Sequence, residues 1–240
     1  MTLNGWTGAT GSRCRCPLVL DGYRSSLDWW LVPLAKALRR VNPDVFTWLS
    51  LLFAILGGLA FWRSGPREEP GLLLAAWACV LLNSVFDLLD GKIAKMTGKA
   101  TPRGDYLDHC VDRFSDAALL SGIAFSPWAS LEWGLLAIVG TLLTSYMGTQ
   151  AQAVGLRRNY AGLLGRADRM VLLLVVPLVE YAWLEFIPGV DYLPSRLRWE
   201  GTESWLGLLV IYFAVVGTLT TAQRFLSGLR AFGKDGQIKE

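Results

Sequence analysis

Six apolar runs, each about as long as a membrane-spanning helix, limit how this chain of 240 residues can fold. A helix needs roughly 20 apolar residues to cross a bilayer core about 30 Å thick. A soluble helical bundle would place polar residues at helical spacing, and the runs WLSLLFAILGGLAFW and MVLLLVVPLV show no such polar face. The sequence therefore predicts an all-α integral membrane protein. The six expected transmembrane helices are Val45–Trp62, Gly71–Gly91, Asp105–Phe125, Leu131–Val154, Arg169–Ile187 and Glu203–Phe225.

The basic residues are distributed unevenly between the two ends of these runs. Of the 23 Lys and Arg residues, six precede the first run, and four lie at each of the junctions that follow the second, fourth and sixth runs. The connections on the opposite side hold only four, and Arg113 lies inside the third run. Because cytoplasmic loops carry an excess of Lys and Arg, we expect both N and C termini in the cytoplasm. The membrane itself is expected to be the cell (plasma) membrane.

The segment before the first run is amphipathic. SLDWWLVPLAKALRRVNPD alternates apolar and basic residues at helical spacing, and Trp29 and Trp30 suit the lipid headgroup region. A juxtamembrane helix on the membrane surface, a helix packed on the transmembrane helices, or both, would fit this pattern. We expect an N-terminal tail at 1–22, the amphipathic helix at 23–41, one six-helix membrane domain at 42–232 and a C-terminal tail at 233–240.

An acidic stretch, DLLDGKIAKMTGKATPRGDYLDHCVDRFSD, lies between the second and third apolar runs. Asp87 and Asp90 are three residues apart and share a helix face, as do Asp108 and Asp112 on the next helix, four residues apart. These helices are consecutive and antiparallel, so their cytoplasmic ends lie side by side and the two pairs can converge. Four neighbouring carboxylates repel one another, and a bound Mg²⁺ or Mn²⁺, which prefers oxygen ligands, would relieve that repulsion.

Other interpretations of the acidic stretch are open. The aspartates could simply pair with neighbouring lysines, or form the relay of a cation or proton transporter. NSVFDLLD also resembles loosely the first aspartate-rich motif of membrane prenyltransferases, although the later runs contain no second one. One turn deeper, Asp116 is expected to form a structural pair with Arg113, because a buried charge needs a partner. His109 should point about 100° away from the Asp108 face and is left out of the site.

The acidic stretch matches the pattern D-x2-D-G-x2-A-K-x8-G-x3-D-x3-D. This pattern resembles the signature of the CDP-alcohol phosphotransferase family, which has Arg where this chain has Lys95. Lysine keeps the positive charge but loses the bidentate fork of arginine. The six apolar runs after an amphipathic helix also resemble the layout of that family. The fixed positions are Asp87, Asp90, Gly91, Ala94, Lys95, Gly104, Asp108 and Asp112.

The resemblance implies an enzyme of phospholipid biosynthesis. A CDP-alcohol, typically a CDP-linked lipid with a diacyl or archaeal ether tail, is attacked at its β-phosphorus by the hydroxyl of an acceptor alcohol, and CMP leaves. Family members use two divalent ions and are often homodimers, and membrane lipid but no nucleic acid is expected as a further partner. The implied roles are Asp87, Asp90, Asp108 and Asp112 as metal ligands, Asp112 also as general base, and Gly91, Ala94, Lys95 and Gly104 as the lining of the CDP site.

Three arginines follow at the ends of later runs. Arg166 and Arg169 lie three apart at an expected helix start, and Arg224 lies at the cytoplasmic end of the last run. In family members with phosphorylated acceptors, basic residues in comparable places bind the phosphate, so the resemblance implies a polyol phosphate. This chain has SYMGTQ, with Gly148 and Gln150, where the family's inositol-phosphate enzymes resemble SYxKAR. Inositol phosphate, glycerol phosphate and other polyol phosphates are therefore alternatives.

Overall fold

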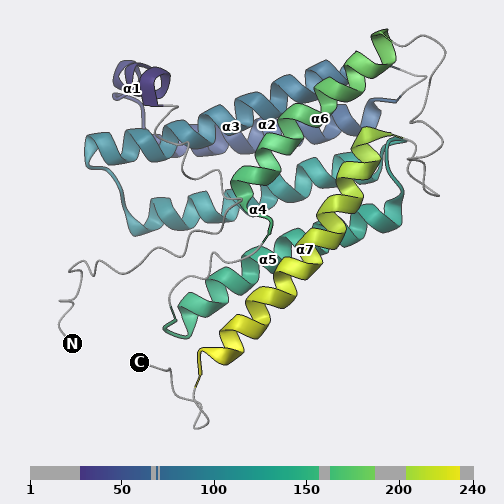
Figure 1. Ribbon diagram of the computed structural model, residues 1–240. Coiled ribbons are helices and arrows are strands. Elements are labelled where there is room, and N and C mark those ends of the chain that lie inside the picture. Colours follow the sequence, from purple (N-terminus) through teal and green to yellow (C-terminus); the bar gives the residue numbers. More distant parts are fainter. Residues whose placement is uncertain (1–27, 66–68, 70, 157–162, 187–203, 233–240) are drawn as a thin grey trace.

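The computed structural model describes residues 28–65, 69, 71–156, 163–186 and 204–232 (Figure 1). The expected tails at 1–22 and 233–240 lie outside these ranges. Each of the six apolar runs overlaps one long helix, so the all-helical prediction is confirmed. The described helices are α1 Asp28–Ala37, α2 Pro43–Arg63, α3 Leu72–Thr97, α4 Pro102–Ala124, α5 Leu131–Ala153, α6 Arg166–Phe186 and α7 Trp205–Arg230.

Four of the described helices are long and apolar enough to cross a membrane. They are α2, α3, α5 and α7, and the mean hydropathy of their most apolar stretches lies between 1.2 and 2.1. The sequence of α4 is rich in charged residues, and α6 begins with a charged turn. An integral membrane protein is therefore supported, whereas six transmembrane helices and cytoplasmic termini stay predictions.

The end of α3 differs from its expected position and shapes the acidic region. The helix continues past the apolar run to Thr97, so Lys95 lies in its last turn rather than in a loop. Gly98 ends the helix with a φ of 66°, a left-handed conformation that glycine adopts without strain. After a loop at 98–101, the Thr101 hydroxyl caps α4 by accepting the Gly104 N–H at 3.1 Å. The acidic ends of α3 and α4 are therefore joined by a very short connection.

The amphipathic helix α1 packs on the end of α3. Its buried residues Leu31 and Ala35 join Leu89 and Ile93 of α3 in one apolar cluster. Trp29, by contrast, is 80% exposed. The alternative of a helix packed on the long helices is thus present, and contact of the exposed face with lipid stays a prediction.

Two glycines let α2 and α4 cross closely. A Cβ atom added to Gly122 would lie 2.1 Å from the carbonyl oxygen of Gly58, and one added to Gly58 would lie 2.4 Å from that of Ala118. Membrane helices use small residues in this way, because backbones can then approach and gain van der Waals contact. Since α2 also runs alongside α3 (Figure 1), the crossing fixes where α4 lies relative to α3.

Buried polar groups close the end of the bundle opposite the acidic loop. Glu180 of α6 is 3% exposed and accepts the backbone N–H of Leu206, in the first turn of α7, at 2.9 Å. A carboxylate at a helix N-terminus is stabilised by the unpaired N–H groups and the helix dipole. Ser204 donates to the Trp128 carbonyl at 2.7 Å, and the Trp128 indole donates to Ser64 at 2.8 Å. These contacts join the ends of α2, α6 and α7.

Candidate active site

The structure brings the four aspartates of the acidic stretch together. Asp87 and Asp112 contact the same guanidinium, that of Arg166, and one oxygen of Asp108 lies within 4.8 Å of one of Asp112. Asp90 and Asp112 are only 6% and 4% exposed. The spacing on two consecutive helices, with the short loop between them, accounts for this convergence.

Arg166, at the start of α6, lies between the carboxylates of α3 and α4. Its Nη1 and Nη2 donate to Asp87 Oδ2 and Oδ1 at 3.1 and 3.0 Å, a bidentate pair. The same Nη2 lies 2.5 Å from Asp112 Oδ1. One cationic group therefore contacts both helices at once, which means that α3 and α4 direct carboxylate oxygens toward a common point.

A third helix reaches the same site through a residue that the sequence pattern did not indicate. The hydroxyl of Thr47, on α2, donates to Asp90 Oδ2 at 2.6 Å. Both side chains are buried. A threonine within an apolar run carries no periodic signal, so only the register of α2 against α3 could have identified it.

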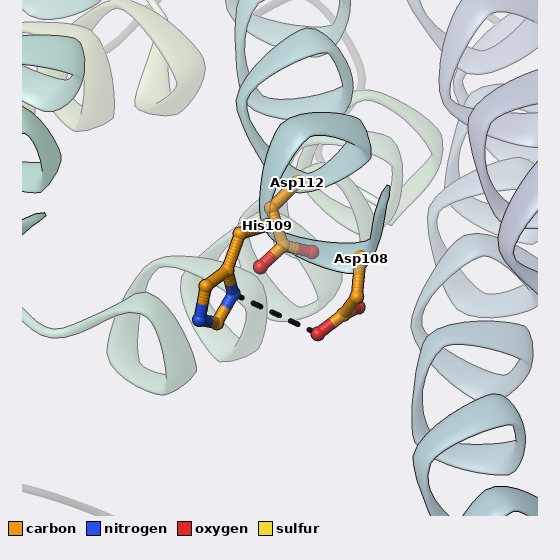
Figure 2. Close-up of side chains that lie close together, drawn as sticks. All are labelled: Asp108, His109 and Asp112. Atoms are coloured by element: carbon orange, nitrogen blue, oxygen red, sulfur yellow. Dashed lines mark ion pairs between the residues drawn. The ribbon is translucent and has the colours of Figure 1, made fainter. Parts of the chain in front are cut away.

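His109 also lies beside the acidic cluster (Figure 2). Its Nδ1 is 3.8 Å from Asp108 Oδ2, and its Nε2 is 3.8 Å from Asp105 Oδ1. One possible ligand atom each from Asp108, His109 and Asp112 lie within 4.8 Å of one another. The expectation that His109 points away from the Asp108 face is therefore wrong. Helical side chains lean toward the N-terminus, and the long imidazole ring can lie back over the preceding turn.

The donor atoms of this cluster fit a hard divalent cation. Asp87 and Asp112 come from different helices and already share one guanidinium, so one cation can contact both. Carboxylate oxygens are the ligands that Mg²⁺ and Mn²⁺ prefer, and an imidazole nitrogen nearby is acceptable to Mn²⁺. The residues present therefore fit divalent metal.

The residues expected to line the CDP site lie around the same loop. Gly91, Ala94 and Lys95 are on the last turns of α3, and Gly104 is in the first turn of α4. A Cβ atom added to Gly91 would meet nothing within 4 Å among the described residues. Packing therefore gives no reason for a glycine there, although a helix-interior glycine costs about 1 kcal/mol relative to alanine. The role of Gly91 in a CDP site stays a prediction.

A buried ion-pair network lies one turn deeper. The expected pair of Arg113 with Asp116 is present at 3.6 Å, but Arg169 of α6 is the closer partner of Asp116 at 3.0 Å. Asp116 and Arg169 are 2% and 4% exposed. Arg169, expected to bind the acceptor phosphate, is thus buried against Asp116 of α4. The pair anchors the start of α6, and with it Arg166, against α4.

Arg224 lies in another part of the bundle. It is on α7, and its Nη1 donates to the Thr144 carbonyl of α5 at 2.6 Å. Thr144 and Thr221 form a hydrogen bond between the same two helices at 2.9 Å. Arg224 is therefore placed by the contact of α5 with α7, whereas Arg166 is placed by the contact of α6 with α3 and α4.

Comparison with known proteins agrees with this arrangement. The sequence profile of the family described as CDP-alcohol phosphatidyltransferase matches residues 40–220. The phosphatidylinositol phosphate synthase of Cutibacterium acnes is 30% identical over 222 residues, which cover 89% of this chain and 99% of that protein.

Solved structures of the Mycobacterium tuberculosis phosphatidylinositol phosphate synthase are also similar. The structure with CDP-DAG bound has a TM-score of 0.63 and 26% identity, covering 83% of this chain and 94% of that one. The structure in complex with manganese and citrate has a TM-score of 0.64 and 26% identity, covering 83% and 88%. These matches rule out the prenyltransferase and transporter interpretations. The chain belongs to the CDP-alcohol phosphatidyltransferase family and is a membrane transferase of phospholipid biosynthesis.

Proposed function

We propose that this enzyme transfers a phosphatidyl-type group from a CDP-linked lipid to a hydroxyl of a phosphorylated polyol, with inositol phosphate as the first candidate acceptor. Two relatives support the substrates: one is named for phosphatidylinositol phosphate synthesis, and a solved one holds CDP-DAG. The observation that carries the proposal is the meeting of Asp87, Asp112 and Arg166, from three helices, at one point. Carboxylates for metal and an arginine for phosphate are thereby within reach of each other.

The aspartates would hold two divalent ions, which neutralise the diphosphate charge and align the reacting oxygens when bound. This chain's own residues would do the rest. Asp112 accepts the proton of the acceptor hydroxyl. The hydroxyl oxygen forms a bond to the β-phosphorus, and the bond from that phosphorus to the oxygen that leaves with CMP breaks. The backbone at Gly91 and Gly104, with Ala94 and Lys95, binds the cytidine and diphosphate.

The acceptor phosphate would be bound chiefly by Arg166. Its planar fork suits two phosphate oxygens, and it stands beside the proposed general base, Asp112. Arg169 is buried against Asp116 and would act indirectly, by holding the start of α6, whereas Arg224 lies at the contact of α5 with α7.

A panel of acceptors tests the proposed reaction. Purified enzyme with Mn²⁺ and CDP-diacylglycerol should release CMP with inositol phosphate and much less with free inositol, because only the former can bind the arginines. Glycerol 3-phosphate and an assay without acceptor complete the panel. CMP release with glycerol 3-phosphate but not with inositol phosphate would make glycerol phosphate the acceptor and would still support the phosphate site. Equal release with free inositol would overturn the phosphate site.

Replacement of Arg166 by Ala should weaken binding of the acceptor and strengthen binding of the metal. Losing charge-assisted hydrogen bonds of about 1.5–3 kcal/mol should raise the KM for the acceptor roughly 10–100-fold. Removing a cation that competes for Asp87 and Asp112 should lower the half-saturating Mn²⁺ concentration. The KM for the CDP-lipid should change little, and steady-state CMP release measures all three quantities.

Two variants control this experiment. Arg63 is an exposed arginine at the end of α2, away from the acidic loop, and Arg63→Ala should behave as wild type. Arg166→Lys keeps the charge without the fork and should give an intermediate KM. An unchanged acceptor KM in Arg166→Ala would remove Arg166 from the acceptor site.

We also propose six transmembrane helices, an active site that faces the cytoplasm at the plasma membrane, and a homodimer. The uneven distribution of Lys and Arg supports the orientation. The family profile, which spans residues 40–220, supports one membrane domain at 42–232. Helices α4 and α6 can cross a bilayer despite their charges, because Asp116 and Arg169 are buried against each other.

A further inference from the structure

We propose that Thr47 is a positioning residue of the metal site, which holds the carboxylate of Asp90 in its metal-binding orientation. Thr47 lies on α2, outside the acidic stretch and outside the residues assigned above to metal, nucleotide or acceptor. The inference rests on the metal role proposed for Asp90.

The hydrogen bond from Thr47 is selective for Asp90. A helical threonine commonly donates its single hydroxyl hydrogen to the carbonyl four residues back. Here the Pro43 carbonyl is 3.5 Å from Thr47 Oγ1, whereas Asp90 Oδ2 is at 2.6 Å. A distance of 2.6 Å is typical of a hydroxyl that donates to a charged carboxylate. The hydroxyl hydrogen of Thr47 is therefore donated to Asp90 rather than to the Pro43 carbonyl.

The surrounding packing fixes Thr47 relative to Asp90. Asn83 of α3 donates to the Ser50 carbonyl of α2 at 2.8 Å, one turn from Thr47. Phe86 of α3 lies against two rings of α2, with centroids 6.1 Å from Phe46 and 5.5 Å from Phe53. These contacts hold α2 in one register against α3. Thr47 is thus a rigid donor, and not a side chain that happens to lie near the site.

The hydrogen bond has a direct consequence for a metal ligand. Fixing one oxygen of Asp90 stops the carboxylate from rotating about its Cβ–Cγ bond, so less conformational freedom is lost when the other groups gather around an ion. Partners that orient ligands in this way typically contribute 10–100-fold to metal affinity or activity. Thr47 is also buried, so water cannot replace its hydroxyl easily.

Binding of Mn²⁺ alone, followed by electron paramagnetic resonance of the detergent-purified protein, tests the inference. Thr47→Val keeps the shape but removes the donor, and should raise the Kd for Mn²⁺ about 10–100-fold. Thr47→Ser keeps the donor and should restore wild-type affinity. In assays, Thr47→Val should raise the half-saturating Mn²⁺ concentration and leave the KM for the acceptor unchanged.

The chain offers a matched control in Thr141. It is 1% exposed on α5, and its hydroxyl has no hydrogen-bond partner in the described part of the chain. Thr141→Val makes the same chemical change in a comparably buried place and should leave the Mn²⁺ affinity unchanged. Melting temperatures without metal report any loss of folding. If Thr47→Val does not fold, Thr47→Ala is used instead and should also raise the Kd for Mn²⁺.

A double-mutant comparison separates this inference from the proposed function. Asp90→Asn should weaken Mn²⁺ binding, and adding Thr47→Val to it should cause no further loss, because Thr47 acts through Asp90. Wild-type affinity in Thr47→Val alone would overturn the positioning role and leave the metal site intact. Wild-type affinity in Asp90→Asn would overturn the metal role of Asp90 and the inference with it.

Discussion

Replacement of Asp112 by Asn should reduce turnover by at least about a thousandfold. General base catalysis typically contributes 10²–10⁴-fold, and an amide can neither accept the proton nor hold a cation as a carboxylate does. Asp112 is 4% exposed and lies against Arg166, where it would meet the acceptor hydroxyl in the proposed function. CMP release under saturating Mn²⁺, CDP-lipid and acceptor measures the loss.

The same variant should still bind the CDP-lipid, because the residues proposed for the nucleotide are unchanged. Asp105→Asn is the matched control, since Asp105 lies on the same helix with a side chain that is 75% exposed. It should keep near-normal rates. Near-normal turnover in Asp112→Asn would exclude Asp112 as the base, and loss of CDP-lipid binding together with turnover would assign it to substrate binding instead.

Replacement of Gly122 by Ala should have the largest effect on stability. Its new methyl group would lie 2.1 Å from the Gly58 carbonyl oxygen, a backbone atom that cannot turn aside as a side chain can. Overpacking of a well-packed interior costs about 1–3 kcal/mol, and a clash between two backbones belongs at or above the upper end of that range. We expect a melting temperature many degrees lower in detergent, or little folded protein.

Gly228 provides the control for this substitution. It also lies inside a helix, α7, but a Cβ atom added there meets nothing within 4 Å in the ranges that the structure describes. Gly228→Ala should therefore be neutral or stabilising by up to about 1 kcal/mol, because alanine has the higher helix propensity. Equal melting temperatures for the two variants would contradict the close crossing of α2 and α4.

The long helices and the acidic cluster could be predicted because both depend on local spacing. Apolar runs of sufficient length define α2 to α7, and aspartates three and four residues apart share a face whatever the rest of the chain does. The end of α3 was less predictable. It is set by the conformation of Gly98 and not by the end of the apolar run, so Lys95 belongs to the helix.

The contacts that depend on how distant helices align could not be predicted. Thr47 meets Asp90 only because α2 lies in one register along α3, and Arg169 meets Asp116 only because the first turn of α6 lies at that level of α4. No sequence spacing encodes these alignments. They follow from how whole helix faces fit together, as in the close approach of α2 and α4 at Gly58 and Gly122.

The position of Arg166 has a consequence for the order of events in catalysis. The guanidinium of Arg166 cannot keep its ion pairs with Asp87 and Asp112 and also bind an incoming phosphate through the same N–H groups. If metal takes the carboxylates and the acceptor takes the arginine, occupancy of either site favours occupancy of the other by the same factor, as thermodynamic reciprocity requires. In the proposed function, metal and acceptor would therefore bind cooperatively, and Arg166 would link the two sites.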